Sequence, residues 1–403
     1  MKTLAPLPLV DPLDPLALDD AFDTDVRLVR DTVRDFVRSR ILPEVGGWFE
    51  AGIFPRELPR ELGELGLLGM HLDGYGCAGA SATAYGIACR ELEAGDSGLR
   101  SFVSVQGSLA MYPIHAYGSE AQKSLWLPRL ASGEAIGCFG LSEWDYGSEP
   151  TGMRTTARTR GDGYVIDGTK AWITSGGIAD VAIVWAHLDP EPGVEASGSD
   201  VRGFVIPTDT PGFTTRNIER KLSLRASVTS ELVLADCYVP ASAMLPDVRG
   251  MRGPLSCLNE ARYGIVWGAV GAARACYEAA LAYATTRVQW GKPIAGFQLT
   301  QAKLANMALE LQKAQLLASH LGRLKDAGTL APAHVSFGKL NNVREALAIA
   351  RDARTILGAS GITLEYPIMR HMNNLESVLT YEGTSEIHTL IIGQALTGLA
   401  AFA

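Results

Sequence analysis

The spacing of hydrophobic residues changes twice along this 403-residue chain. In residues 25–40 they recur at steps of three and four, which is typical of a helix with one buried face. Residues 138–246 instead hold short runs rich in β-branched side chains, as strands do. Beyond residue 253 the helical spacing returns, and its clearest seam consists of Leu304, Met307, Leu311, Ala314, Ala318 and Leu321. Because neither period suits the other kind of element, helices and strands should be segregated along the chain.

This order predicts an α+β fold rather than a doubly wound sheet. We expect an N-terminal helical domain over residues 1–136, a central β domain over residues 137–247 and a C-terminal helical bundle over residues 248–403. Further helices are expected at residues 58–70 and 83–93, and strands at residues 163–168, 181–186, 203–207 and 231–239. The pair Asp167-Gly168 lies between two strand-like runs and predicts a tight hairpin turn.

Charge and composition exclude several classes of protein. The chain carries 36 Lys and Arg against 44 Asp and Glu, a formal net charge of −8, and no basic run, which argues against nucleic-acid binding. It has no uninterrupted apolar stretch of membrane-spanning length, and residues 1–25 lack the pattern of a signal peptide. Six cysteines lie far apart without disulfide or metal-ligand spacing. We therefore expect a reduced, cytoplasmic protein without a metal site.

The common catalytic and nucleotide-binding motifs are absent. There is no G-x-G-x-x-G after a strand, no G-x-x-x-x-G-K-[ST], no G-x-S-x-G and no H-E-x-x-H. These absences argue against the usual nicotinamide, P-loop, hydrolase and zinc-enzyme interpretations. Three polar clusters remain as candidates for chemistry.

The first cluster is Leu379-Thr-Tyr-Glu-Gly-Thr-Ser-Glu-Ile387, before the last apolar segment. Thr384 or Ser385 is suited to cap the following helix, and Glu386 to sit in its first turn. Glu382 does not fit that role, because it lies outside the helix beside Gly383. From the residues alone it is either an ordinary surface carboxylate, which is the commoner case, or a carboxylate that a ligand approaches.

The second cluster joins Cys138-Phe-Gly-Leu-Ser-Glu143 and Gly147-Ser148 to Lys170-Ala-Trp-Ile-Thr-Ser175. A Gly/Ser loop at a strand end offers free N–H groups, and Trp172 adds a flat aromatic face beside the hydroxyl of Thr174. This combination suits a planar polar ring such as a flavin. A tryptophan that is simply part of a hydrophobic core explains the same residues about as well.

The third cluster is Glu91-Leu-Glu-Ala-Gly-Asp-Ser-Gly-Leu-Arg-Ser101, where a helix ends at glycines and presents Arg100 and Ser101. Arginine binds carboxylates with a fork of donors that lysine lacks. Without further information, an interdomain salt bridge is the simpler interpretation of Arg100.

These clusters have the order and setting found in the acyl-CoA dehydrogenase flavoproteins, and the chain from about residue 11 to residue 402 resembles the glutaryl-CoA dehydrogenase branch of that family. Other stretches that carry the resemblance are Ser104-Val-Gln, Ala226-Ser, Asn259-Glu-Ala-Arg-Tyr-Gly, Leu321-Gly-Arg-Leu-Lys-Asp, Asn374-Leu-Glu and Thr380-Tyr-Glu-Gly-Thr. The resemblance implies an N-terminal helical domain, a central β domain, a C-terminal four-helix bundle and a homotetramer.

The resemblance also implies a role for individual residues. Glu382 matches the catalytic base. The matches to substrate-binding positions are Glu93, Arg100, Ser101, Ser148, Arg262 and Tyr381. The matches to FAD-binding positions are Phe139, Leu141, Ser142, Gly147, Trp172, Thr174, Arg287, Gln298, Leu357, Gly358, Thr384 and Glu386, of which Arg287 and Gln298 would serve the FAD of a neighbouring subunit.

The implied reaction is the FAD-dependent α,β-dehydrogenation of an acyl thioester. In the glutaryl-CoA branch the product, glutaconyl-CoA, then loses CO2 to give crotonyl-CoA, and an electron-transferring flavoprotein is the usual acceptor. The chain departs from the branch's usual sequence at Trp144, at Glu149, at Leu99 and at Ser175-Gly-Gly177. These departures keep open another acyl-CoA, an acyl group on a carrier protein, a variant that does not decarboxylate, or a flavin-binding protein without turnover.

Overall fold

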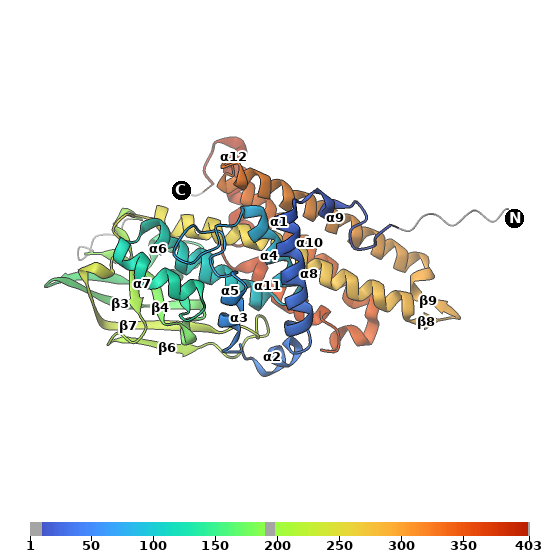
Figure 1. Cartoon of the computed structure of the whole chain (residues 1–403), viewed down its shortest axis with the longest axis horizontal. Coiled ribbons are helices and arrows are strands. Elements are labelled where there is room, and N and C mark those ends of the chain that lie inside the picture. Colours follow the sequence, from blue (N-terminus) through green and yellow to red (C-terminus); the bar gives the residue numbers. More distant parts are fainter. Residues whose placement is uncertain (1–9, 190–197, 402–403) are drawn as a thin grey trace.

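Helices, a sheet and helices again follow one another along the chain, as the α+β prediction requires. The computed structural model describes residues 10–189 and 198–401. The molecule is elongated, with the sheet at one end and long helices reaching toward the other (Figure 1). The N-terminal helices are α1 Thr24–Phe36, α2 Val45–Ala51, α3 Leu58–Glu64, α4 Ala82–Gly95, α5 Ser97–Ser104, α6 Tyr112–Tyr117 and α7 Glu120–Ala131, with π-helical turns at Val37–Ile41 and Val105–Met111.

Local sequence sets the ends of these helices. The Asp23 side chain accepts a hydrogen bond from the Val26 N–H and caps α1, and Ser81 caps α4 in the same way. The predicted helix over residues 58–70 ends early, at Glu64. Gly66 and Gly69 adopt φ angles of +70° and +66°, which a right-handed helix does not contain. Almost every residue of α4 is buried, so this helix forms the centre of the N-terminal domain.

The middle of the chain forms one seven-stranded sheet. Its strands are β1 Gly137–Gly140, β2 Thr156–Arg160, β3 Gly163–Thr174, β4 Val181–Leu188, β5 Val201–Pro207, β6 Phe213–Asn217 and β7 Thr229–Pro240. The order is β1-β4-β2-β3-β7-β6, with β5 also paired to β4. The four predicted strands therefore exist, and each is longer than predicted.

The predicted turn at Asp167-Gly168 is wrong. These two residues lie inside β3, at a shift in its register with β7, and the turn between β2 and β3 falls at residues 161–162. Gly168 has a φ of +152°, and a Cβ there would lie 2.4 Å from Thr155 Oγ1. The glycine is needed for a bulge and a close backbone approach rather than for a turn.

The C-terminal helices are α8 Arg252–Thr286, α9 Gln298–Asp326, α10 Pro332–Leu357, α11 Ile368–Thr380 and α12 Ser385–Thr397. A short hairpin of β8 Val288–Gln289 and β9 Lys292–Pro293 joins α8 to α9 at the end of the molecule opposite the sheet (Figure 1). The predicted seam on α9 is buried along its whole length. The helix α8 packs against both α4 and α10, so it lies between the N-terminal and C-terminal helices.

Parts of all three regions meet at α11. Asp96, between α4 and α5, accepts hydrogen bonds from Arg370 and from Asn374 Nδ2 (2.9 Å) on α11. The Asn374 side chain in turn accepts from the Leu224 N–H (2.7 Å), which belongs to the loop before β7. A Cβ on Gly98 would lie 2.6 Å from the Ala226 carbonyl oxygen of the same loop. These contacts hold the loop before β7 against α4, α5 and α11.

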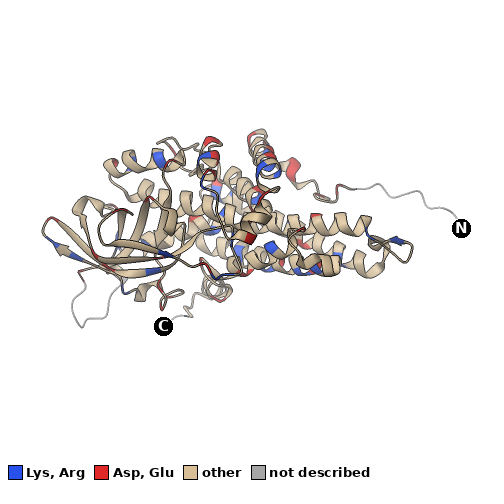
Figure 2. Cartoon of the chain, turned by 90° about the horizontal axis from the view of Figure 1, so that it is seen from below, with Lys and Arg blue, Asp and Glu red and all other residues tan. Residues whose placement is uncertain are grey.

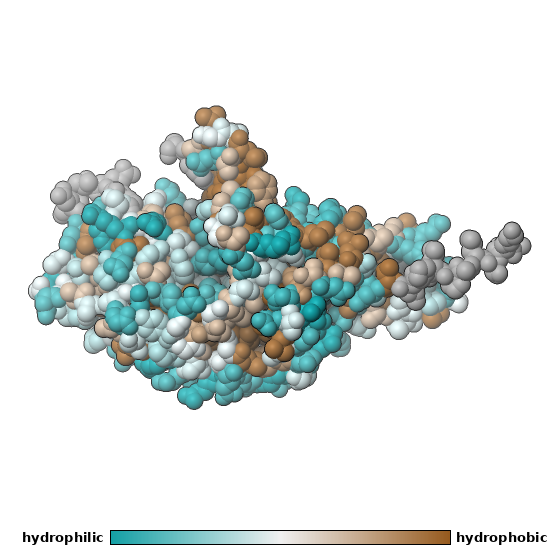
Figure 3. Space-filling model, turned by 45° about the horizontal axis from the view of Figure 1, so that its top comes forward, coloured by the Kyte–Doolittle hydropathy of each residue, from teal (hydrophilic) through white to brown (hydrophobic). Residues whose placement is uncertain are grey.

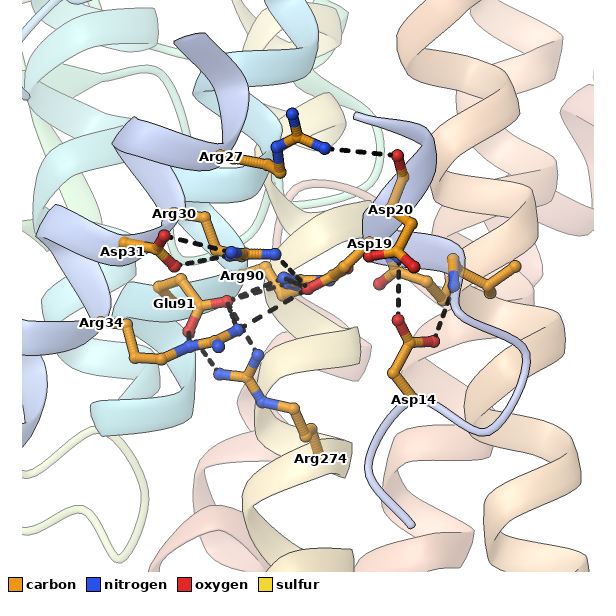
Figure 4. A network of polar contacts seen from close by, with 12 residues as sticks. Asp14, Asp19, Asp20, Arg27, Arg30, Asp31, Arg34, Arg90, Glu91 and Arg274 are labelled. Carbon is orange, nitrogen blue, oxygen red and sulfur yellow. Dashed lines mark hydrogen bonds and ion pairs between the residues drawn. The ribbon is translucent and has the colours of Figure 1, made fainter. Parts of the chain in front are cut away.

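A second ionic network ties the N-terminal segment to the helical core (Figure 4). Buried Glu91 on α4 accepts from Arg34 and Arg274, and Arg90 donates to Asp19 with Nη1–Oδ1 at 2.7 Å. A cavity of about 240 Å³ lies beside this network and contains none of the candidate site residues. The network therefore fastens α1, α4 and α8 together, away from the predicted chemistry.

None of the described helices combines the length and the apolarity that a membrane span needs. In the view of Figure 2, basic and acidic residues are interspersed along the helices.

Candidate active site

Glu382 lies in the short segment between α11 and α12, with its backbone in a left-handed conformation (φ +53°). The residue is half-buried, and its Oε2 atom is screened from solvent without a hydrogen-bond partner among the described residues. An unpaired buried acceptor costs free energy, so this carboxylate oxygen is suited to bind a proton or a hydrogen-bond donor. The side chain therefore does not behave as the ordinary surface carboxylate that the residues alone favoured.

Two buried cations hold the backbone around Glu382. Lys339 on α10 donates from Nζ to the carbonyl oxygens of Tyr381 and Gly383, the latter at 2.6 Å. Arg262 on α8 donates from Nε to the Glu382 carbonyl oxygen at 2.7 Å. Three successive carbonyl groups are thus held from two helices.

The same cations affect the acidity of Glu382. Burial raises the pKa of its carboxyl group, while the charges of Arg100, Lys339 and Arg262 oppose that rise. Burial is the larger effect, so the pKa lies above its usual value. A raised pKa makes a carboxylate a stronger base, and such shifts gather at catalytic sites.

Arg100 is fully buried in the same region. Its Nε donates to Glu93 Oε2 at 2.6 Å, and its Nη2 donates to the Tyr381 hydroxyl. The salt bridge lies within the N-terminal domain, while the bond to Tyr381 crosses to the segment that carries Glu382. Gly268 on α8 faces this pair, and a Cβ there would lie 2.0 Å from Glu93 Oε2. The absence of a side chain at this position lets the pair sit directly against α8.

Several polar atoms in this region have no partner among the described residues. Arg100 Nη1 and Glu93 Oε1 are both buried and unpaired, as is Glu382 Oε2. Native proteins rarely leave buried polar groups unsatisfied without water or a ligand. This group of atoms is therefore suited to line a binding site. Ser101, the neighbour of Arg100, is also buried.

The second cluster is assembled at the ends of β1 and β3. The Ala171 N–H donates to the Ser142 carbonyl oxygen at 2.9 Å, and Lys170 Nζ donates to the Leu141 carbonyl oxygen at 3.1 Å. These bonds align the loop after β1 with Trp172, whose φ is +63° and which is 56% exposed. Trp172 is therefore exposed at the surface and is not part of the hydrophobic core.

The remaining residues of this cluster lie around it. Phe139 is buried against Trp185, with ring centroids 6.2 Å apart, and Thr174 is half-buried at the end of β3. Gly147 and Ser148 are exposed on the loop that follows Trp144. The ring of Trp144, one of the departures from the glutaryl-CoA branch, stands edge-on to Trp172 at 5.2 Å and donates to Glu231.

Four predicted residues lie away from both clusters, near the β8–β9 hairpin. Arg287 follows the end of α8, Gln298 begins α9, and both are exposed. Leu357 and Gly358 are at the end of α10. This end lies beside the start of α9, as the hydrogen bond from Lys303 Nζ to Thr355 Oγ1 (2.7 Å) shows. Thr384 caps α12 as predicted, accepting from the Ile387 N–H, and exposed Glu386 is in its first turn.

Sequence reasoning missed Lys339, Gly268 and Asp96. A single lysine or glycine on a long helix carries no local pattern that distinguishes it from a surface lysine or a packing glycine. Asp96 lay within a cluster that was singled out, but its partners on α11 are far away in sequence. No group of His, Cys, Asp and Glu side chains suited to hold a metal ion occurs in residues 10–189 and 198–401.

Three domain descriptions of one family match the chain: acyl-CoA dehydrogenase, N-terminal domain, at residues 23–134; middle domain, at residues 138–237; and C-terminal domain, at residues 248–397. Among curated relatives, human mitochondrial short-chain specific acyl-CoA dehydrogenase is 36% identical over 368 residues, covering 91% of this chain and 88% of the relative.

Two solved structures of glutaryl-CoA dehydrogenase from Mycobacterium smegmatis are more similar. One is 64% identical with a TM-score of 0.94, covering 97% of this chain and 99% of the other. The second, in complex with FADH2, is 61% identical with a TM-score of 0.95, covering 98% and 100%. The sequence, the fold and the assembled clusters agree, and the chain belongs to the acyl-CoA dehydrogenase family.

Proposed function

We propose that this enzyme oxidises glutaryl-CoA to glutaconyl-CoA and then releases CO2 to give crotonyl-CoA. The observation that carries the proposal is the position of Arg100. It is a fully buried cation beside the Glu382 segment, and its Nη1 is unpaired among the described residues. An acyl thioester that ends in a carboxylate would supply the missing partner. The similarity to glutaryl-CoA dehydrogenases of M. smegmatis supports the same substrate.

FAD is the cofactor, as the family and the relative in complex with FADH2 indicate. The exposed face of Trp172, in a left-handed backbone beside the Leu141–Ser142 loop, fits a planar ring system. When bound, FAD supplies the two-electron acceptor that takes the β-hydrogen of the substrate as hydride. We propose that Phe139, Leu141, Ser142, Gly147, Trp172, Thr174, Thr384 and Glu386 hold it within one chain.

We propose that Glu382 removes the α-proton of the thioester. An α-hydrogen is a very weak acid, so its removal needs a strong base and a carbonyl polarised by hydrogen bonds. Burial already raises the pKa of Glu382, and a bound thioester would exclude more water and raise it further. The backbone N–H of Glu382 is the proposed donor to the thioester carbonyl. Proton removal at the α-carbon and hydride loss at the β-carbon together leave the enoyl thioester.

We propose that the same residues also carry out the decarboxylation. Arg100, with Ser101 beside it and Glu93 and Tyr381 fixing its guanidinium, would hold the distal carboxylate. When the bond to CO2 breaks, its electron pair remains on the carbon chain as a dienolate. Glu382, protonated in the first step, returns that proton and gives crotonyl-CoA. The base thus starts the next cycle ionised. Ser148 and Arg262 are proposed to line the thioester part of the site.

One observation favours a second candidate, an acyl thioester without a distal carboxylate. Two of the three guanidinium nitrogens of Arg100 are already paired inside the protein, with Glu93 and Tyr381. If Glu93 neutralises Arg100 in the bound state as well, an uncharged acyl chain on CoA or on a carrier protein would fit better, and no CO2 would be released.

Assembly is also a proposal. Arg287, Gln298, Leu357 and Gly358 are far from the flavin cluster of their own chain, which supports a role at the FAD of a neighbouring copy. Large apolar side chains are exposed at both ends of the helical domain, including Trp290 (88%), Leu299 (84%) and Leu396 (73%). The helix α12 projects from the body with apolar residues on its surface (Figure 3). We propose a homotetramer, with an electron-transferring flavoprotein as electron acceptor and the cytoplasm as location.

The deciding experiment is anaerobic mixing of the FAD-loaded enzyme with glutaryl-CoA, while flavin absorbance and CO2 are recorded. We expect both bleaching and CO2. Bleaching without CO2 would refute decarboxylation, and neither signal would refute glutaryl-CoA as substrate.

The variant Glu382→Gln should keep its FAD and lose reduction by substrate, because the amide cannot accept the proton. Glu376→Gln is a matched control, since Glu376 is an exposed glutamate on α11 that pairs with Arg351. Wild-type reduction rates in Glu382→Gln would show that another group is the base.

A further inference from the structure

Lys339 makes an unusual set of contacts for a lysine. It lies in the first half of α10 and is only 2% exposed. Among the described residues it makes no hydrogen bond to a carboxylate. Its Nζ instead donates to the carbonyl oxygens of Tyr381 and Gly383, the residues on either side of Glu382. Burying a lysine away from water is unfavourable, so a lysine kept at this position is expected to have a specific task.

The segment held by Lys339 needs external support. Glu382 has a φ of +53°, a region that residues other than glycine seldom occupy. Such a backbone conformation persists only where the surroundings hold it in place. Lys339 binds the carbonyl before and the carbonyl after the strained residue, and Arg262 binds the carbonyl of the residue itself.

We propose that Lys339 is a positioning residue for the proposed proton transfer. Its ammonium group holds Tyr381 and Gly383 so that the Glu382 side chain points into the site, and its positive charge increases the ionised fraction of that carboxyl group. The inference rests on the proposed role of Glu382 as base, and it adds a residue that does not touch the substrate.

The effect of the Lys339 charge on the ionisation of Glu382 depends on every charged or titratable group near these two side chains. Burial lowers the pKa of Lys339, and the nearby Glu382 carboxylate opposes that effect. The other charged or titratable groups that face the pair are Arg262 on α8, Arg100 on α5, Glu93 on α4, Tyr381 after α11 and His388 on α12. Burial lowers the pKa of His388 to about 3, so His388 adds no charge at neutral pH. Burial lowers the pKa of Lys339 to about 7, so below that pH its removal takes away one of three cations that stabilise ionised Glu382.

The alternative is that Lys339 only packs the helices together. Asn342 provides a direct comparison, because it is one turn further along α10 and equally buried. Its Nδ2 also donates to two carbonyl oxygens of other helices, those of Val266 at 3.0 Å and Ala314 at 3.2 Å. Asn342 makes no hydrogen bond to residues 381–383 among the described residues, so its loss should destabilise the fold without changing proton transfer.

The test compares Lys339→Met, Lys339→Arg and Asn342→Leu in the FAD-loaded enzyme. For each variant the FAD content, the Tm and the rate of anaerobic flavin reduction by glutaryl-CoA are measured across pH. We expect Lys339→Met to lower the rate about 100-fold at neutral pH, the loss that small misplacements of a catalytic group produce. Its rate profile should also move to higher pH, because Glu382 loses its proton less readily. Lys339→Arg keeps the positive charge, so its profile should stay at the wild-type pH.

A readout without turnover uses infrared spectra of the free enzyme at different pH values. The C=O band of protonated Glu382, identified by its absence in Glu382→Gln, should persist to higher pH in Lys339→Met. This measurement and the Lys339→Arg profile still apply if Lys339→Met loses flavin reduction entirely.

The outcomes separate this inference from the proposed function. If Glu382→Gln abolishes reduction but Lys339→Met behaves like Asn342→Leu, with a lower Tm and an unchanged pH profile, Lys339 has a structural role only. If Glu382→Gln keeps reduction, the base assignment fails, and the role of Lys339 fails with it. A shifted profile in Lys339→Arg would refute the part of the proposal that depends on charge.

Discussion

Gly268→Ala tests how closely the Arg100 site depends on the packing of α8. The new Cβ would lie 2.0 Å from Glu93 Oε2 and 3.1 Å from Arg100 Nε. Glu93 is fully buried, and its Oε2 is held at 2.6 Å from Arg100. To restore an ordinary contact of about 3.4 Å, the carboxylate must move by more than about 1 Å, and we expect the paired guanidinium to shift with it.

The expected effects on stability and on activity differ. Alanine favours a helix interior over glycine by about 1 kcal/mol, while overpacking a core typically costs about 1–3 kcal/mol. The net change in folding free energy should therefore stay below about 2 kcal/mol. Displacement of a positioned group by about 1 Å lowers the rate about 100-fold, which corresponds to about 2.7 kcal/mol of transition-state stabilisation.

The assay compares kcat/KM for glutaryl-CoA and for butyryl-CoA, which lacks the distal carboxylate. We expect the large loss with glutaryl-CoA only. Gly264→Ala is the matched control, because Gly264 lies one turn earlier on α8 and faces Tyr85 Oη at 3.0 Å and Cys89 Sγ at 3.2 Å. Equal losses with both thioesters, or the same selectivity change in Gly264→Ala, would refute a carboxylate-binding role for this pair.

Two further predictions concern stability and cofactor retention. Glu91→Gln removes the carboxylate that Arg274 and Arg34 share and should destabilise the fold by about 3–5 kcal/mol at neutral pH, measured by urea denaturation. Burial alone would raise the pKa of Glu91, but its arginine partners hold it well below the usual value, so this contribution exists above about pH 4.3 and disappears as the pH falls. The difference between wild type and Glu91→Gln should therefore shrink on acidification, and a constant difference down to pH 3 would contradict the assignment. Glu143→Ala removes the acceptor for Lys170 (2.9 Å) and for the N–H and hydroxyl of Thr155, so the loop after β1 should loosen and FAD should dissociate more easily in gel filtration. Unchanged FAD retention would show that Glu143 does not order the flavin site.

The order of the three regions was predictable because it depends on local periodicity. The α9 seam needed only the period of a helix, and its members are indeed buried. Local signals narrowed the cap of α12 to Thr384 or Ser385, and the structure shows Thr384. They also gave an exposed Trp172 as one of two alternatives. Local signals failed at Asp167-Gly168, because the same residue pair suits both a hairpin turn and a bulge. Only the approach of Thr155 from another segment distinguishes the bulge from the turn.

Most implied site residues came from resemblance and not from a local pattern. Nothing around Glu382 in the sequence distinguishes a buried base from a surface carboxylate. Its environment is supplied by Arg100 of α5, Arg262 of α8 and Lys339 of α10, which are more than 40 residues away along the chain.

The sequence by itself determined the fold class and the succession of helices and strands. Those properties follow from spacing and composition, which each segment carries within itself. Only the tertiary structure decided which charges surround Glu382, that Arg100 is paired with Glu93 and Tyr381, and that Lys339 holds the strained segment. The physical reason is that burial and electrostatic interaction depend on distance in space, and packing alone brings residues of α4, α5 and α10 to the segment between α11 and α12.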